Sequence, residues 1–197
     1  MAKKKQAEAD VTRPFFEYLW AFYRASRGQI RFSYKDLTKK LLDYNDPEKP
    51  NAFMRRPQFE AFEMYVFLKE YLDNPRLADL MDEWRNNRGK FQLQNTPALG
   101  QQDMFKSFDA ASYEMALKTL ESVRQDYANY IFALTMGVGK TILMATCIFY
   151  EFLLARKFPQ DPRFCHNAIV FAPDTTVLHS LREIQDFDKT KVIPPEY

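Results

Sequence analysis

Apolar residues in the first two thirds of the chain recur mainly at helical spacing. Such spacing places them on one face of a helix, which can then pack against a core. Thr12 followed by Pro14 is typical of a helix start, and Gly28 of a helix end. The pattern predicts helices over about residues 14–27, 36–42, 57–72, 75–84 and 109–123. Residues 45–51 and 90–106 lack a period and are predicted to be loops.

The pattern changes after residue 109. The runs 130–134 and 168–171 are short, unbroken and rich in β-branched and aromatic residues, which is typical of strands buried on both faces. Helices are predicted over about residues 141–156 and 175–185. A strand, helix, strand, helix order predicts a parallel sheet with crossover helices, hence an α/β fold. We therefore expect a helical N-terminal region over residues 1–108 and a second domain over 109–197.

Composition narrows the class of protein. The chain has 197 residues, a formal net charge of +2, 46% hydrophobic and 16% aromatic residues. That excludes disorder over most of the chain, and we expect the aromatic residues at helical spacing to form core. Two cysteines cannot build a disulfide framework or a four-cysteine zinc site, so a reducing cytoplasm is expected. The longest apolar stretch, residues 142–155, is too short to cross a membrane.

A glycine loop lies between the predicted strand 130–134 and the helix that follows. Gly137 and Gly139 would let backbone N–H groups turn toward phosphate oxygens, and the helix start adds a partial positive charge. Lys140 would meet the β and γ phosphates of ATP, and the Thr141 hydroxyl would bind Mg²⁺. Leu134 departs from the usual pattern, which has a small residue five places before Gly139. The expected nucleotide-binding residues are Thr135, Met136, Gly137, Val138, Gly139, Lys140 and Thr141.

Residues 133–141 and 167–184 together resemble motifs I and Ia of superfamily 2 DEAD/DEAH-like helicases, most of all the Res subunits of type III restriction enzymes. The resemblance implies the first part of a RecA-like ATP-binding domain. It implies an ATP-hydrolysing DNA helicase or translocase that uses Mg²⁺, acts on duplex DNA and has a modification or specificity subunit as partner. The nucleic-acid contacts it implies are Pro173, Asp174, Thr175, Thr176 and Ser180. The hydroxyl groups among them serve equally well as helix caps.

Arg56, Pro57 and Gln58 resemble the short segment before motif I in which a glutamine reads the adenine edge. A side-chain amide suits that role because it both donates and accepts hydrogen bonds. Gln58 lies far upstream of Gly137 in the sequence. Either a helical insertion intervenes between the two, or the match is false.

Several features leave alternatives open. No apolar strand ending in Asp-Glu, the second motif of these helicases, follows Thr141. We therefore expect the chain to be the N-terminal portion of a longer polypeptide, with a truncated sheet and no catalytic activity alone. The alternatives are a P-loop transferase or regulatory module, and a helical interaction protein with an accidental glycine loop. Residues up to 42 carry a net charge of +6. Their basic side chains, which include Arg24, Arg27 and Arg31, either contact nucleic acid or face solvent.

Overall fold

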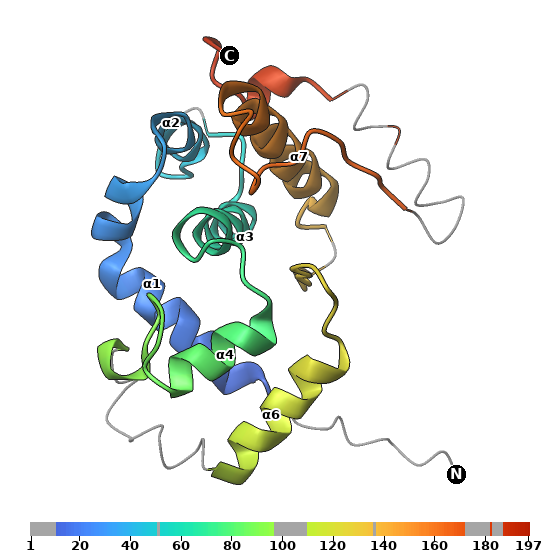
Figure 1. Cartoon of the computed structure of the whole chain (residues 1–197). Coiled ribbons are helices and arrows are strands. Elements are labelled where there is room, and N and C mark those ends of the chain that lie inside the picture. Colours follow the sequence, from blue (N-terminus) through green and yellow to red (C-terminus); the bar gives the residue numbers. More distant parts are fainter. Residues whose placement is uncertain (1–10, 51, 97–109, 136, 172–181, 183–186) are drawn as a thin grey trace, which may run out of the picture. The chain divides into compact units, whose positions relative to one another are not determined.

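The computed structural model describes residues 11–50, 52–96, 110–135, 137–171, 182 and 187–197. Its elements are helical, and most lie where the apolar pattern predicts them (Figure 1). The α-helices are α1 (Arg13–Ser33), α2 (Asp36–Asn45), α3 (Arg56–Val66), α4 (Leu77–Arg85), α6 (Ala110–Ser122) and α7 (Lys140–Lys157). The described residues also form three short elements: the π-helix η1 (Phe67–Tyr71) and the 3₁₀ helices η2 (Leu93–Asn95) and η3 (Lys189–Lys191).

Two helix boundaries differ from the prediction. Gly28 does not end α1, which continues to Ser33. The apolar face continues past the glycine with Ile30, which is buried, and that burial outweighs the modest cost of a helical glycine. The helix predicted over 57–72 changes to a π-helix at Phe67, a wider turn that the apolar period does not encode.

The predicted parallel sheet is wrong for the part of the chain that the structure describes, which contains no strand. Residues 131–135 and 167–171 have no regular secondary structure. Several of their apolar side chains are exposed, Ile131 by 90%, Ile169 by 79% and Phe171 by 87%, whereas Phe132 and Leu134 are half-buried. A strand needs a hydrogen-bonded neighbour, and no described segment pairs with either run. The predicted helix 175–185 lies outside the described residues except for Arg182, which is helical.

The chain forms two compact units, and each combines two separate stretches. The first unit comprises Met1–Arg27 and Pro75–Tyr130. Its core is an aromatic cluster around Trp84 of α4, which lies 5.1 Å from the ring of Tyr18 and 5.8 Å from Phe15, both of α1. Phe91 stacks on Trp84 at 5.8 Å and lies 6.1 Å from Phe15. These aromatic side chains are core, as the sequence predicts.

The second unit comprises Gly28–Asn74 and Ile131–Tyr197. Within it α3 packs against α7, and α2 packs against both α3 and α7 (Figure 1). Side chains of η1 also contact α7, through Glu70 and Lys69. The C-terminal segment is fixed to α2 because the buried Asn45 amide donates to Val192 O at 2.8 Å. This arrangement places the first turns of α3 and α7 beside each other. Among the described residues, no helix has both the length and the apolar character needed to span a membrane.

Candidate functional site

The glycine loop leads directly into α7. Gly137 and Gly139 have φ of 76° and 81°, a left-handed conformation that favours glycine. Gly139 is the N-cap of α7, and its carbonyl accepts hydrogen bonds from the backbone N–H groups of Ile142 at 3.1 Å and Leu143 at 3.3 Å. The first N–H groups of a helix have no partner within the helix, so this loop presents donors to an anion.

Lys140 and Thr141 occupy the first turn of α7. The Lys140 side chain is exposed and folds back over the loop, where its Nζ donates to Thr135 O at 3.1 Å. Thr141 and Val138 are half-buried. The loop thus combines an exposed cation, a hydroxyl and the start of a long helix within a few residues. Met136, also predicted to bind nucleotide, lies outside the described residues.

Two side chains from the start of α3 contact the same loop. Gln58 donates from Nε2 to Gly139 O at 3.0 Å, although 81 residues separate the two in sequence. Arg55 donates from Nη1 to Gly137 O at 3.3 Å. The structure therefore brings Gln58, predicted from the sequence, together with the glycines, the lysine and the threonine of the loop.

Most of the residues between Gln58 and the loop belong to the other compact unit. Pro75–Tyr130 belongs to the first unit, whereas Gln58 and Gly137–Thr141 belong to the second. The chain thus leaves the second unit after Asn74 and returns to it at Ile131. Their separation in sequence therefore does not keep Gln58 away from the loop.

The Gln58 amide is engaged within the protein. Its Oε1 accepts from the backbone N–H of Arg55 at 2.8 Å, in addition to the bond that Nε2 gives to Gly139. A glutamine amide has two donor hydrogens and two acceptor lone pairs, so one of each remains. Because Gln58 is only 2% exposed, a base can reach that remaining edge only after the loop moves.

Arg55 is a candidate that the sequence analysis missed. It lies one residue before the segment Arg56–Gln58 and carries an exposed cation to the loop carbonyl. With Lys140 it places two positive charges at one short loop. No local signal in the sequence marks Arg55, because its partner lies 82 residues away.

The predicted nucleic-acid residues Pro173, Asp174, Thr175, Thr176 and Ser180 lie outside the described residues. Arg24 is exposed, and its guanidinium lies 4.8 Å from the centre of the Trp20 ring. Arg31 instead contacts acidic side chains of its own unit, Asp43 at 3.6 Å and Glu63 at 3.9 Å. The basic segment therefore contains both a solvent-facing and a protein-facing arginine.

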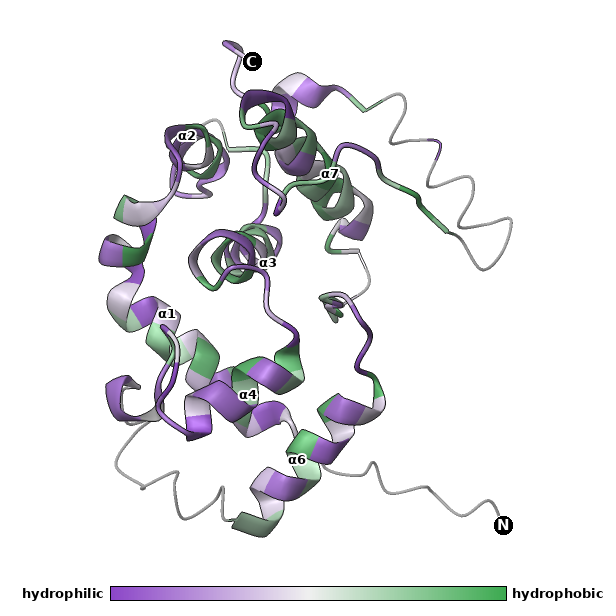
Figure 2. Cartoon of the chain, viewed as in Figure 1, coloured by the Kyte–Doolittle hydropathy of each residue, from purple (hydrophilic) through white to green (hydrophobic). Residues whose placement is uncertain are grey.

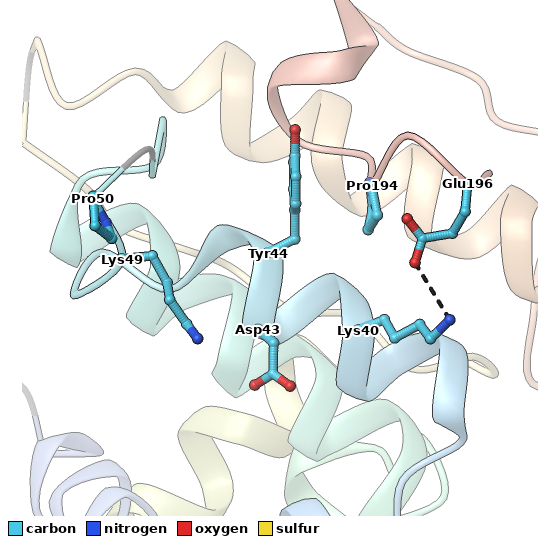
Figure 3. A pocket seen from close by; sticks show the side chains of 7 residues that line it. All are labelled: Lys40, Asp43, Tyr44, Lys49, Pro50, Pro194 and Glu196. Carbon is cyan, nitrogen blue, oxygen red and sulfur yellow. Dashed lines mark ion pairs between the residues drawn. The ribbon is translucent and has the colours of Figure 1, made fainter.

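A separate pocket lies between α2 and the C-terminal segment, with a volume of ≈ 530 Å³ (Figure 3). It contains no residue of the glycine loop, and its two lysines are balanced by two carboxyl groups. Lys40 Nζ lies 3.3 Å from Glu196, and hydrogen bonding with Tyr197 and Glu196 raises the pKa of Lys40. The pocket is lined by Lys40, Asp43, Tyr44, Lys49, Pro50, Pro194 and Glu196.

The described residues contain no group of three or more histidine, cysteine or acidic side chains placed to hold a metal ion. The metal ligand predicted from the sequence is the Thr141 hydroxyl. No protein-family model, no curated protein and no solved structure matches the chain significantly. The functional argument rests on the geometry of the glycine loop.

Proposed function

We propose that the glycine loop binds ATP with Mg²⁺, and that the chain is the ATP-binding part of an ATP-dependent DNA helicase or translocase of the type III restriction Res-subunit type. The observation that carries the proposal is the meeting of Gln58 and Arg55 with the loop at Gly139 and Gly137. A glycine turn that only joins two elements needs no amide and no guanidinium from a distant helix.

The residues fit a nucleoside triphosphate. The left-handed glycines and the first turn of α7 offer backbone donors, and Lys140 and Arg55 supply positive charge for phosphate oxygens. The Thr141 hydroxyl would hold the metal ion, whose role is to neutralise charge on the phosphates. On nucleotide binding, the Lys140 ammonium would leave Thr135 O and contact a phosphate oxygen. A movement of the loop would also expose the unused donor and acceptor of the Gln58 amide to the base. The DNA part of the proposal rests on the resemblance of residues 167–184 to motif Ia.

The Lys140→Ala variant tests the nucleotide site. Calorimetric titration with ATP and Mg²⁺ should show that affinity falls at least tenfold, because the ammonium group contributes a charge-assisted bond of roughly 1.5–3 kcal/mol. Folding should survive, since the side chain is exposed. Lys118→Ala is the matched control, as it removes the same charge from an exposed helical position in the first unit. Equal affinities for Lys140→Ala and Lys118→Ala would contradict the assignment.

A second measurement separates the helicase from the transferase alternative. Phosphate release by the full protein should rise when duplex DNA is added, and it should be absent in Lys140→Ala. Transfer of phosphate to a small acceptor, with no response to DNA, would instead favour the transferase alternative.

A further inference from the structure

The central side chains of α7 are mostly apolar, so they do not by themselves fix the position of the helix. Between Ile142 and Ala155 the interruptions are few, Thr146 and Glu151 being the clearest, and Figure 2 shows the helix coloured hydrophobic along most of its length. Apolar packing is not directional, so it constrains the sliding and rotation of such a helix only weakly. Directional polar contacts therefore decide how the loop at its first turn meets α3.

Four buried or half-buried side chains form directional polar contacts between α7 and the α3–η1 segment, with one tyrosine and one glutamate on each side. Tyr65 of α3 donates its hydroxyl to Glu151 of α7 at 2.5 Å. Tyr150 of α7 donates its hydroxyl to Glu70 of η1 at 2.8 Å. The two tyrosine rings pack edge to face at 5.9 Å. We call this group, Tyr65, Glu70, Tyr150 and Glu151, the Tyr–Glu clasp.

Both carboxyl groups of the clasp have further partners. Glu151 forms an ion pair with the buried Lys69 at 3.1 Å and accepts from the backbone N–H of Cys165 at 2.9 Å. Glu70 accepts from the Thr38 hydroxyl and from the backbone N–H of Lys35. Burial, followed by the nearby carboxyl groups, raises the pKa of both tyrosines, so their hydroxyls remain protonated donors.

The π-helix makes this arrangement possible. Four consecutive residues, Phe67 to Glu70, are buried in η1, and the neighbours Lys69 and Glu70 reach different partners on or beside α7. In a regular α-helix adjacent side chains point about 100° apart, so a single face would bury fewer of them. A buried ion pair contributes little net stability compared with apolar packing, which favours a role in fixing position.

We propose that the Tyr–Glu clasp is a positioning device for the glycine loop: it fixes the register of α7 against α3, so that Gln58 and Arg55 meet Gly139 and Gly137. The clasp begins seven residues after Gln58, about 10 Å along the same helix. Because α3 and α7 are packed helices, a shift at the clasp displaces the loop as well. Its consequence for nucleotide affinity rests on the proposed function.

The test compares the double variant Tyr65→Phe/Tyr150→Phe with Tyr44→Phe in the full chain. The double variant keeps both rings and removes the two hydroxyls that cross between α3–η1 and α7. Tyr44→Phe also removes a tyrosine hydroxyl from the second unit, but that hydroxyl donates to Thr190 O and joins α2 to the C-terminal segment. Hydrogen exchange is measured without nucleotide at the amides of Ile142 and Leu143, which bond to Gly139 O.

We expect exchange at these two amides to rise about tenfold in the double variant relative to the amides of Leu41 and Leu42 in α2, and to stay unchanged in Tyr44→Phe. An equal rise in α2 and α7 would show a general loss of stability and overturn the inference, as would no rise at all. This measurement requires no nucleotide, so it stands even if ATP does not bind.

The second arm is a double-mutant cycle with Gln58→Ala, read as ATP affinity. In the chain with Gln58, the double variant should bind ATP about five- to tenfold more weakly. In the Gln58→Ala chain, the same two tyrosine changes should cause almost no additional loss of affinity, because both changes act through one contact. Additive losses would mean that the clasp does not act through Gln58 and would overturn the inference. If the wild-type chain does not bind ATP, only the proposed function is contradicted. The exchange measurement then tests by itself whether the clasp positions the glycine loop.

Discussion

Gly137 and Gly139 share a left-handed backbone but have different surroundings. A Cβ atom at Gly137 would meet nothing within 4 Å, whereas one at Gly139 would lie 2.5 Å from Gln58 Nε2 and 3.2 Å from Ile142 Cδ1. The first glycine is therefore required only by its conformation. The second is required also by the close approach of Gln58, which is the contact that joins α3 to the loop.

Alanine at these two positions should separate conformation from contact. Both Gly137→Ala and Gly139→Ala should cost roughly 1–2 kcal/mol in the free energy of unfolding, the penalty of a left-handed alanine. Only Gly139→Ala should also displace Gln58, and so lower ATP affinity beyond the loss seen for Gly137→Ala. Urea unfolding and calorimetric titration measure the two effects. Equal ATP affinities for the two variants would argue against a role for the Gln58 contact.

At the scale of elements, the loop after α7 is held by a compact set of charges. The Arg163 guanidinium pairs with Asp161 through Nε at 2.9 Å and Nη2 at 2.8 Å. Its Nη1 donates to Asp73 and to the carbonyl of Glu70, both at 3.1 Å. One arginine therefore joins this loop to the end of η1, beside the Tyr–Glu clasp. Hydrogen bonding from Arg163 lowers the pKa of Asp161 below its usual range.

Because the pKa of Asp161 is depressed in the folded state, its stabilisation is complete above the unfolded pKa of about 3.9 and is lost as the pH falls further. Arg163→Ala should therefore cost about 1–2 kcal/mol at pH 7, and this difference from the wild type should narrow below about pH 4. Urea unfolding across that range provides the measurement. In an Asp161→Asn background the narrowing should largely disappear; its persistence would point to another titrating group.

At the scale of the whole molecule, the excess of positive charge before residue 42 does not act as one surface. Arg24 is exposed beside Trp20, whereas Arg31 contacts Asp43 and the buried Glu63. A count of charges along the sequence therefore overstates the number of positive side chains that can bind a polyanion such as DNA. The proposed DNA contact falls to residues such as Arg24 rather than to the segment as a whole.

Salt dependence of DNA binding distinguishes the two arginines. If Arg24 contacts a DNA phosphate, Arg24→Ala should flatten the slope of log K against log salt by up to about 0.9, with the free energy of unfolding unchanged. Arg31→Ala should destabilise the chain and leave the slope as it is. Duplex binding by the full protein at several salt concentrations, with urea unfolding of each variant, tests both. If Arg24→Ala leaves the slope unchanged, Arg24 does not contact a DNA phosphate.

The sequence by itself determined most helices of this protein and the composition of its glycine loop. A helix closes its hydrogen bonds within four residues, and its apolar face is written in the same stretch, so local periodicity locates α2, α4, α6 and α7 well. The left-handed Gly137 and Gly139 are likewise local. The resemblance singled out Gln58, but the sequence could not establish whether Gln58 reaches the loop.

Only the tertiary structure decided which distant segments meet. The runs 130–134 and 168–171 read as buried strands, yet burial and pairing depend on partners that a short run does not specify. For the same reason the contact of Arg55 with Gly137, the Tyr–Glu clasp and the protein-facing Arg31 could not be read from spacing. Each joins residues far apart in sequence, and the packing of the helices determines whether they meet.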